Sequence, residues 1–508
     1  MRHFFKNIFN HIIITGLIVA LQITFIVIEL SKFTNQAWYI STTLHALSII
    51  VVFFIIYKNS NPAVKLAWIV PILLFPIFGG FLYLVFGHLF IPRILKRNIV
   101  NSNAILSENI EQDMAILDSL AEKDYSVYSQ CKYISKFGDA PVWCNTLTHY
   151  FSDGEEYLSA LLEDLDKAKK YIFIEYFIIS QGYMWTQILE VLKRKVEEGL
   201  EVRIIYDDFG STTVLPPKYY LQLEKIGIKC ICFNRIFPLF SMIMNNRDHR
   251  KIVVIDGQIG YTGGINIADE YINRKERFGY WKDAGLRLEG DAVTNMVILF
   301  LQIWAISKGT DFDPKPYLSK NIDINNSSYI QPYGDSPLDE EAVAENVYLN
   351  IINNSKKYLW IYTPYLIMDN VMMESLKLAC KRGVDVRIVT PGIPDKKMVF
   401  YMTRCSYKPL MEAGAKLYEY TPGFIHAKCT LCDDSIVDIG TVNYDYRSLY
   451  HHFECGVLMY NSSIVDDLKK DMENSFEVSE EITEDFLYKR RFNINVAGPI
   501  LHLFAPLL

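Results

Sequence analysis

The chain has 508 residues, of which 50% are hydrophobic and 21% are charged, and its formal net charge at pH 7 is -7. This length is enough for two or more domains. The acidic balance argues against a nucleic-acid partner, because binding to phosphate backbones normally needs a basic surface. It does not exclude an anionic lipid, which a local basic patch is sufficient to bind.

Three apolar runs occupy the amino-terminal part of the chain, at residues 12–28, 40–57 and 66–86. Each is close to the ~20 residues that a helix needs to span a bilayer. A cleaved signal peptide is disfavoured, because no small-x-small site follows the first run. Three successive runs without a polar face predict two to three transmembrane helices within residues 1–92, rather than core helices. Prolines inside the third run predict that it is kinked or re-entrant.

The cysteines indicate on which side of the membrane the rest of the chain lies. Basic residues flank the apolar runs on both sides of a three-span arrangement, so the positive-inside rule gives no orientation. All nine cysteines follow the membrane region, in an odd number and without framework spacing, which indicates free thiols in a reducing compartment. We therefore expect a cytoplasmic location for the region after the membrane. Cys429 and Cys432 would point to opposite faces of a strand, so they are expected to pack rather than to bind zinc.

Strand and helix patterns alternate after a polar stretch at 93–140, which is expected to be a linker with helical pieces. The alternation predicts two α/β lobes, 141–325 and 326–508, with largely parallel central strands. The second lobe repeats the order of the first. Expected strands lie at 171–179 and 201–206 in the first lobe and at 358–365 and 384–389 in the second, with helices between them at 184–198 and 371–382.

One motif occurs twice in the chain. The pattern His-x-Lys-x4-Asp begins at His249 and again at His426, and after six further residues each copy continues with Gly-[Gly/Thr]-x-Asn. One copy alone would be suggestive, whereas two in register are a strong signal. The first copy contains His249, Lys251, Asp256 and Asn266, and the second contains His426, Lys428, Asp433 and Asn443.

The spacing of this motif suits chemistry on a phosphodiester. Alternation along a strand places the His and Lys of one copy on the same face, about 7 Å apart. The Lys would neutralise charge on the phosphate oxygens while the imidazole attacks phosphorus or moves a proton, and the glycine turn would bring the Asn amide back to the same phosphate. A covalent mechanism needs both a nucleophile and a proton donor, yet each copy has one His. We therefore expect the two copies to face each other across one cleft.

The duplicated motif resembles that of the phospholipase D superfamily, and within it the chain is most similar to bacterial cardiolipin synthases. Gly263-Gly264, Gly440-Thr441 and the run 443–448 carry the narrower resemblance, which covers most of the chain. It implies a multi-pass transferase of the bacterial plasma membrane, without metal or cofactor. The implied reaction condenses two phosphatidylglycerol molecules into cardiolipin and glycerol through a phosphohistidine.

The resemblance also implies roles for the motif residues. By family precedent His249 is the nucleophile and His426 the acid/base, although the sequence itself leaves this assignment open. Lys251, Lys428, Asn266 and Asn443 would hold the phosphate oxygens. Asp256 and Asp433 complete the two catalytic motifs and are expected to hold the motif's own architecture rather than to touch substrate.

Two further carboxylates lie at equivalent places of the repeat, where Asp283 and Glu454 each open an expected strand. In the family a carboxylate at this place hydrogen-bonds a catalytic imidazole. The family usually has Asn-Phe-Glu where this chain has His452, Phe453 and Glu454. If Glu454 points into the site, His452 faces the same side and Phe453 points away. His452 would then either compete for the hydrogen bond of the carboxylate or contact the lipid headgroup.

Other functions remain open at this point. A hydrolase that releases phosphatidic acid would use the same intermediate, since exclusion of water decides between transfer and hydrolysis. A different phosphatidyltransferase of the same superfamily would share the motif, whereas a non-catalytic scaffold would not need two His-Lys pairs. The apolar segment 236–244 is expected to be a buried strand or a lipid-facing lip, and the basic residues before the apolar tail at 499–508 suit an anionic membrane surface.

Overall fold

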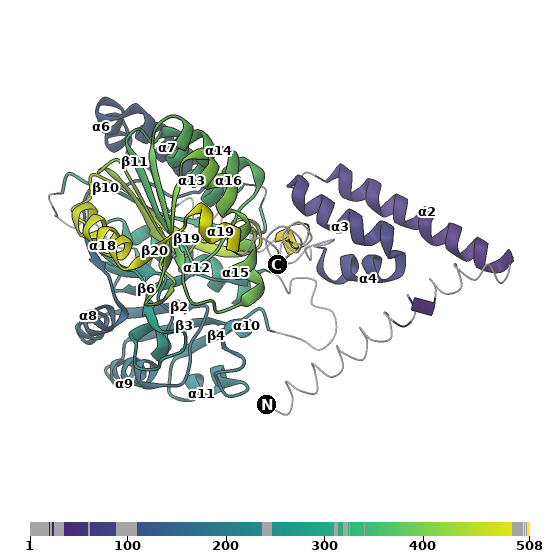
Figure 1. The fold of residues 1–508 in the computed structure, drawn as a ribbon. Helices are drawn as coiled ribbons and strands as arrows, with labels where there is room; N and C mark the ends of the chain where they lie inside the picture. The colour runs from purple at the N-terminus through teal and green to yellow at the C-terminus, as the bar shows by residue number, and fades with distance from the viewer. Residues whose placement is uncertain are drawn as a thin grey trace. The chain divides into compact units, whose positions relative to one another are not determined.

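The computed structural model describes residues 35–58, 61–87, 109–235, 246–308, 313–318, 326–339 and 341–489, with a few isolated residues elsewhere. The chain divides into two compact units (Figure 1). One unit contains Met1–Pro92, Asn234–Asn245 and Pro499–Leu508, and the other contains Arg93–Phe233 and Asn246–Gly498. The predictions for residues 12–28 and 236–244, and most of the carboxyl-terminal tail, lie outside the described residues.

The amino-terminal unit contains three described α-helices, α2 (Asn35–Tyr57), α3 (Pro62–Leu74) and α4 (Pro76–Phe86). The predicted break of the third apolar run is found at Phe75, which lies between α3 and α4 with φ -133° and ψ 75°. Gly79 permits the two helices to approach, because a Cβ there would lie 2.3 Å from the carbonyl oxygen of Pro71. Among the described residues, no helix combines the length and the apolar character that crossing a membrane requires.

The larger unit contains two mixed sheets whose strands follow one another in the same order. Each strand of the first sheet therefore has a counterpart in the second, so the repeat in the sequence is also a repeat in topology. The first sheet is β1 (Thr146–Phe151), β9 (Gly285–Gly290), β7 (Ile259–Gly263), β6 (Lys251–Ile255), β2 (Tyr171–Tyr176), β3 (Glu201–Asp207) and β4 (Lys229–Phe233). The second is β10 (Tyr329–Asp335), β19 (His452–Tyr460), β17 (Ile436–Gly440), β16 (Cys429–Cys432), β11 (Tyr358–Tyr362), β13 (Asp385–Pro391) and β14 (Lys416–Tyr420), extended by β20 (Ser479–Glu481).

The prediction of largely parallel central strands is correct for only part of each sheet. Strands β2, β3 and β4 are parallel, whereas β6, β7, β9 and β1 are paired antiparallel. The reason is the short connection at 256–258, which links β6 directly to β7 as a hairpin and so forces antiparallel pairing. Asp256 and Gly257 have positive φ in this connection, as do Asp433 and Asp434 in the equivalent hairpin of the second sheet.

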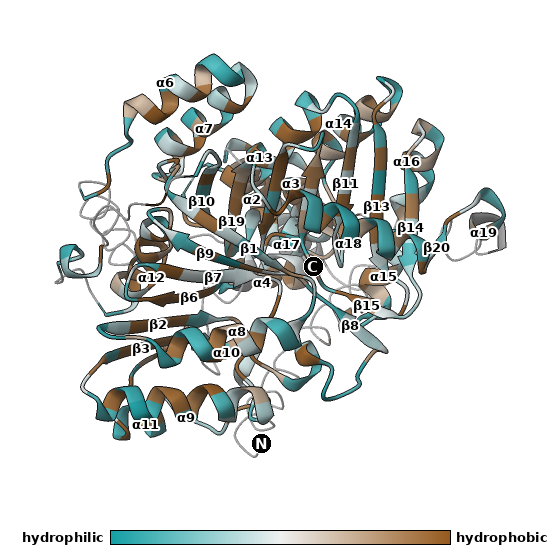
Figure 2. Cartoon of the chain, turned by 90° about the vertical axis from the view of Figure 1, so that its left-hand side faces the viewer, coloured by the Kyte–Doolittle hydropathy of each residue, from teal (hydrophilic) through white to brown (hydrophobic). Residues whose placement is uncertain are grey.

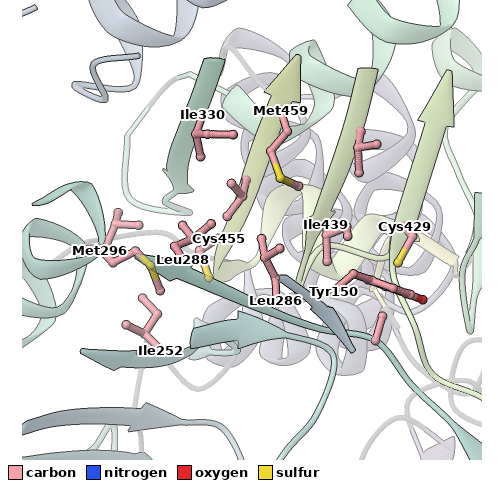
Figure 3. Packing of buried hydrophobic residues seen from close by; sticks show 14 of the residues in the cluster. Tyr150, Ile252, Leu286, Leu288, Met296, Ile330, Cys429, Ile439, Cys455 and Met459 are labelled. Atoms are coloured by element: carbon pink, nitrogen blue, oxygen red, sulfur yellow. The ribbon is translucent and has the colours of Figure 1, made fainter. Parts of the chain in front are cut away.

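The inner faces of the two sheets belong to one hydrophobic core. Figure 3 shows Ile252 and Leu286 of the first sheet in the same cluster as Ile439 and Met459 of the second. The helix α12 (Val293–Lys308) is buried along most of its length in this cluster. Each fully buried side chain of this size stabilises the fold by about 1.5–3 kcal/mol relative to exposure. This shared core packs the two halves against each other as one compact unit.

Helices cover the outer face of each sheet (Figures 1 and 2). Figure 2 shows a largely hydrophobic surface on the central strands β6 and β11, whereas α9 and α11 alternate between hydrophobic and hydrophilic residues. The first sheet is covered by α8 (Gly154–Asp166), α9 (Tyr183–Glu197) and α11 (Tyr219–Lys225), and the second by α13 (Val343–Asn354), α14 (Asn370–Lys381) and α16 (Tyr407–Ala413).

Short elements connect the layers, and the stretch expected to be a linker contributes to the core of the second half. Its helices α6 (Met114–Lys123) and α7 (Tyr125–Phe137) bury Leu120, Cys131 and Ile134 in the cluster that contains α13. The domain boundaries at 92, 140 and 325 stay predictions. The other described α-helices and strands are α10 (Asp208–Ser211), β5 (Arg247–Asp248), β8 (Tyr280–Lys282), β12 (Leu366–Ile367), α15 (Lys397–Cys405), β15 (Gly423–Ile425), β18 (Tyr444–Asp445), α17 (Tyr446–Tyr450), α18 (Val465–Glu477) and α19 (Glu484–Lys489).

The two motif aspartates tie each hairpin to the start of the neighbouring strand. The carboxylate of Asp256 accepts backbone N–H groups of residues 169–171 at 2.7–2.9 Å. The carboxylate of Asp433 accepts those of residues 356–358 at 2.7–2.9 Å. Hydrogen bonds to a charged acceptor are stronger than neutral ones. Each aspartate therefore fixes the end of the strand that follows its own motif histidine, β6 or β16, against the start of β2 or β11.

We expect Asp433→Ala to lower stability by about 2–4 kcal/mol, because it removes three backbone hydrogen bonds at a residue with positive φ. Thermal unfolding of the purified protein measures the change. Asp434→Ala is the matched control, since the adjacent Asp434 also has positive φ but contacts the side chains of Tyr358 and Lys469 and accepts no backbone N–H of residues 356–358. Unchanged unfolding in Asp433→Ala together with lost turnover would instead place this carboxylate at the substrate.

Candidate active site

Each motif histidine directly follows a short strand that pairs with a strand from the other half of the molecule. Strand β5 runs parallel to the start of β19, and the backbone N–H of His249 donates to the carbonyl of Phe453 at 2.9 Å. Strand β15 runs parallel to β8, and the backbone N–H of His426 donates to the carbonyl of Lys282 at 2.7 Å. The two short parallel pairs are equivalent, and together they bring both motif copies to one place.

This pairing places each imidazole against a carboxylate of the opposite half. Nδ1 of His249 lies 2.9 Å from both carboxylate oxygens of Glu454, and Nδ1 of His426 lies 2.9 Å from Oδ2 of Asp283. Both carboxylates are fully buried and both imidazoles are 8% exposed. A carboxylate at Nδ1 selects the tautomer with the proton on that nitrogen, which leaves the lone pair on Nε2 for reaction.

The loops after β7 and β17 explain why the first copy reads Gly-Gly and the second Gly-Thr. A Cβ at Gly264 would lie 2.0 Å from Oδ1 of Asp283, so only glycine leaves room for this carboxylate. In the other half the hydroxyl of Thr441 donates to Oε2 of Glu454 at 2.5 Å and holds the longer side chain in place. Sequence comparison within the repeat marks this difference without revealing its cause.

The motif lysines are buried beside the histidines. Nζ of Lys251 donates to the backbone carbonyl of His249 at 2.7 Å, and Nζ of Lys428 donates to that of His426. Both lysines are 1% exposed. Burial lowers the pKa of Lys251 to about 8 and that of Lys428 to about 7, although nearby carboxylates oppose the shift. An anion bound between the two lysines would favour their charged forms.

The same environment keeps the imidazoles neutral at pH 7. Burial, followed by the charge of Lys251, lowers the pKa of His249 well below its usual value. Burial and Lys428 lower the pKa of His426 to about 4, in spite of the opposing attraction of Asp283. Burial alone would raise the pKa of Asp283, but the attraction of His426 outweighs it and the pKa is lowered. A neutral imidazole with a free Nε2 is a competent nucleophile.

The motif asparagines are held by residues five positions further along each copy. Nδ2 of Asn266 donates to the hydroxyl of Tyr271 at 2.7 Å, and Nδ2 of Asn443 donates to the hydroxyl of Ser448 at 3.0 Å. An amide nitrogen carries two N–H groups, so one of them is left for an anion. Asp256 and Asp433 are five residues along a strand from the motif lysines, roughly 17 Å away, and so lie apart from this group.

Aromatic side chains that the sequence analysis did not single out surround the imidazoles. The ring of Trp281 lies 5.5 Å from that of His426, and its indole N–H donates to Oδ2 of Asp283 at 3.3 Å. Phe177 lies 5.1 Å from His249 in an edge-to-face arrangement. The signal for Trp281 was present in the repeat, because it precedes Asp283 by two residues as His452 precedes Glu454.

His452 does face the same side as Glu454, as alternation along β19 predicted. Its ring lies 5.5 Å from that of His249, the same separation as for Trp281 and His426. It does not take the hydrogen bond of the carboxylate, because its Nδ1 is 3.7 Å from Glu454 and both carboxylate oxygens face His249. Burial lowers the pKa of His452 to about 3, so this third imidazole is neutral as well.

Two α/β halves with one His-Lys pair each, completed by carboxylates exchanged between the halves, define a phospholipase D-like protein. The family model described as "Cardiolipin synthase, PLD-like domain" matches residues 161–280 and 348–476, and the model "Phospholipase_D-nuclease N-terminal" matches residues 46–88. The chain belongs to the cardiolipin synthase family.

Relatives of similar length support this membership. An uncharacterised protein of Streptococcus mutans is 42% identical over 90% of this chain and 99% of its own length. Cardiolipin synthase 2 of Bacillus cereus is 34% identical over 89% of this chain and 88% of its own length. The crystal structure of a phosphatidylserine synthase from Haemophilus influenzae superposes with a TM-score of 0.55 over 75% of this chain and 100% of that one. At 14% identity, that structure shows likeness of fold alone.

The lysine environments predict how activity depends on pH. Both ammonium groups are present near pH 6, and Lys428 and then Lys251 lose their protons as the pH rises through about 7 and about 8. We expect kcat/KM, which reports the free enzyme, to fall over this range because the phosphate loses its cationic partners. Lys428→Arg stays charged and should move the first fall to higher pH. A kcat/KM that rises steadily across this range would contradict the assignment.

The two side chains at the start of β19 are expected to differ in their effect on turnover. Glu454→Gln should lower kcat by about 10²–10⁴-fold, because an amide cannot stabilise the imidazolium of His249 by charge. His452→Asn should be tolerated, since His452 holds neither the imidazole nor the carboxylate in place. Transferase rates of both variants across pH measure this difference. If His452→Asn is inactive while Glu454→Gln stays active, the roles assigned to these two residues are reversed.

Proposed function

We propose that the protein is a cardiolipin synthase that transfers a phosphatidyl group from one phosphatidylglycerol to a glycerol hydroxyl of another, with release of glycerol. The observation that carries the proposal is the composite site. Two neutral imidazoles, each held at Nδ1 by the carboxylate of the opposite half, accompany two buried lysines. One site then contains both the nucleophile and the proton donor that a covalent phosphoryl transfer requires.

In the first step Nε2 of His249 attacks the phosphorus of one phosphatidylglycerol. The bond from phosphorus to the headgroup glycerol oxygen breaks, and His426 gives a proton to that oxygen, so that neutral glycerol leaves. The phosphodiester anion in the site favours the protonated form of His426 that this step needs. Glu454 stabilises the positive charge that develops on His249, and its two oxygens at 2.9 Å support the choice of His249 as nucleophile.

In the second step a glycerol hydroxyl of another phosphatidylglycerol attacks the phosphohistidine. His426 accepts the hydroxyl proton, the new oxygen–phosphorus bond forms, and the phosphorus–nitrogen bond to His249 breaks. Cardiolipin leaves and both histidines return to their starting forms. The buried ammonium groups of Lys251 and Lys428, with the free N–H groups of Asn266 and Asn443, hold the phosphate oxygens through both steps.

The burial of the site favours transfer over hydrolysis. The lysines are 1% exposed, so an ammonium group there attracts the phosphate oxygens with little screening by water. A lipid hydroxyl that arrives with its own acyl chains can displace the remaining water, whereas a hydrolase needs water in the same place. We therefore place phosphatidyl transfer ahead of release of phosphatidic acid.

The amino-terminal unit supports an action at the membrane. Helix α2 contains no Asp, Glu, Lys or Arg and exposes Ile50, Phe53 and Phe54. Exposed apolar side chains in this number suit contact with lipid rather than water. We propose that this unit holds the enzyme at a bilayer that contains phosphatidylglycerol, while the multi-pass topology and the cytoplasmic site stay predictions.

The direct experiment is to incubate the purified full-length protein with phosphatidylglycerol that is labelled in its headgroup glycerol and, in a second sample, in its acyl chains. Equal amounts of free labelled glycerol and acyl-labelled cardiolipin are expected. Phosphatidic acid in place of cardiolipin would make the protein a hydrolase. If neither labelled substrate is converted, the protein does not catalyse the proposed reaction.

One shared site predicts that both histidines are needed for the same turnover. His249→Ala and His426→Ala should each lower kcat by at least about 10³-fold, and the double variant should be little slower than either, because groups that act as a unit are not additive. His149→Ala, which removes a largely exposed histidine of β1, is the control. Retention of about half the activity in either single variant would show two independent sites.

A further inference from the structure

His452 is a buried imidazole that the proposed reaction does not use. It is 7% exposed, and neither of its ring nitrogens has a hydrogen-bond partner among the described residues. Buried polar groups in proteins normally have a partner, because an unsatisfied one has lost its hydration without compensation. His452 lies at the start of β19, which also carries Glu454, and its ring is 5.5 Å from that of His249. Its free nitrogens therefore suggest a ligand at this side of the site.

Three potential metal ligands converge at this point. One ring nitrogen of His249, one of His452 and a carboxylate oxygen of Glu454 all lie within 4.8 Å of one another, and all three residues are buried. Among the described residues, no other group of three or more His, Cys, Asp or Glu side chains has such an arrangement. Two imidazole nitrogens with one carboxylate oxygen form a ligand set that suits Zn²⁺ and neighbouring transition-metal ions.

We propose that His249, His452 and Glu454 form an inhibitory site for a divalent transition-metal ion, best fitted by Zn²⁺. Tetrahedral bonds of about 2.0–2.2 Å place ligand atoms roughly 3.3–3.6 Å apart. The pair of His249 and Glu454, now 2.9 Å apart, would therefore widen slightly, and the most distant atoms of the cluster, which lie within 4.8 Å, would move closer. The ion would lie between Nδ1 of His249 and Glu454, where it replaces their hydrogen bond. His452 would supply the third bond, and the fourth position would be left to a water molecule.

Inhibition follows from the tautomer of His249. A neutral imidazole has one N–H and one lone pair, and its contact with Glu454 places the proton on Nδ1. A metal ion on Nδ1 uses the lone pair of that nitrogen, so the proton must move to Nε2. Nε2 then has no lone pair with which to attack phosphorus. The metal also withdraws the carboxylate that would stabilise the imidazolium during the reaction.

The charges around the cluster select the kind of ion. Lys251 and Lys428 lie near His249 and lower its affinity for any cation. Mg²⁺ and Ca²⁺ prefer several oxygen ligands and bind largely through charge, so this site disfavours them. Ions that form strong bonds to imidazole nitrogen can overcome the repulsion, with affinity rising along the series to Cu²⁺ and remaining high for Zn²⁺.

The other half of the molecule provides an internal comparison. Trp281 takes the equivalent place beside His426, with the same ring separation of 5.5 Å, but its indole N–H donates to Asp283. Indole nitrogen is a donor only and offers no lone pair to a metal. The proposed site therefore exists at His249 alone, although the two halves share the same strand order.

The experiment measures inhibition of the full-length enzyme after treatment with a chelator, which should leave it active. Added Zn²⁺ should inhibit transfer from labelled phosphatidylglycerol, EDTA should restore it, and the same concentrations of Mg²⁺ or Ca²⁺ should not inhibit. In His452→Asn the Zn²⁺ concentration for half-inhibition should rise by at least about tenfold, since even outer-shell changes cost that much in affinity. Each rate is compared with the uninhibited rate of the same variant.

His451→Asn is the matched control, because it removes the adjacent histidine, which is not a member of the cluster, and should leave the inhibition unchanged. If His452→Asn fails to fold, His452→Gln replaces it. Inhibition by Zn²⁺ that is equal in wild type and in the folded His452 variant would overturn the proposal. So would the absence of inhibition in the wild type.

A binding measurement keeps this result separate from the proposed reaction. The visible absorption of bound Co²⁺, titrated into the chelator-treated protein without lipid, should show a site with nitrogen and oxygen ligands that is lost in His452→Asn. The comparison between variants is needed because the chain also has nine free cysteines. A Co²⁺ spectrum that is identical in both proteins would overturn the site even if cardiolipin synthesis is confirmed. A lost Co²⁺ site would support it even if the product proves to be phosphatidic acid.

Discussion

The active site depends on two short parallel strand pairs that join the halves of the molecule. In each pair the backbone N–H of a motif histidine binds the carbonyl of the residue that precedes a carboxylate of the other half. Backbone pairing therefore brings the imidazole and the carboxylate close together, independently of their side-chain rotamers. Without these pairs neither half would contain a histidine with a fixed tautomer. The shared core beneath them holds the two sheets rigidly enough to keep both contacts.

Burial then determines the protonation states of the site residues. The same low exposure that lowers the pKa of His426 to about 4 also lowers that of Lys428 to about 7. The free site therefore favours an anionic ligand. A phosphodiester bound between the two lysines would stabilise their charged forms, and the two neutral imidazoles stay available for attack and proton transfer. This balance also explains why the motif uses lysine. An ammonium group on a flexible stem can be buried and can adjust its charge, whereas a guanidinium stays charged.

Much of the arrangement was predictable from the sequence, because the duplicated spacing at His249 and His426 is local and periodic. The antiparallel part of each sheet was not predicted, although Asp256-Gly257 is a residue pair typical of tight hairpin turns. The equivalent Asp433-Asp434 lacks the glycine, so the sequence signal is weaker in the second sheet. The exchange of carboxylates was also hidden. Asp283 and Glu454 were recognised as strand starts, but the partner of a strand edge is a non-local property. Alternation placed His452 correctly, whereas its lack of a hydrogen-bond partner is visible only in three dimensions.

The loops that face the two carboxylates have a consequence for which substitutions each half tolerates. Gly264 fits the short carboxylate of Asp283 by leaving space, and Thr441 fits the longer Glu454 by donating a hydroxyl. Each loop residue and its carboxylate therefore form a matched couple. A side chain introduced at Gly264 would displace Asp283, and a shorter carboxylate at Glu454 would lose the hydrogen bond from Thr441, whose hydroxyl also contacts the main chain of Cys455. A substitution at one member of a couple therefore alters the contact made by the other, so the carboxylate that positions each imidazole depends on pairs of positions rather than on single residues.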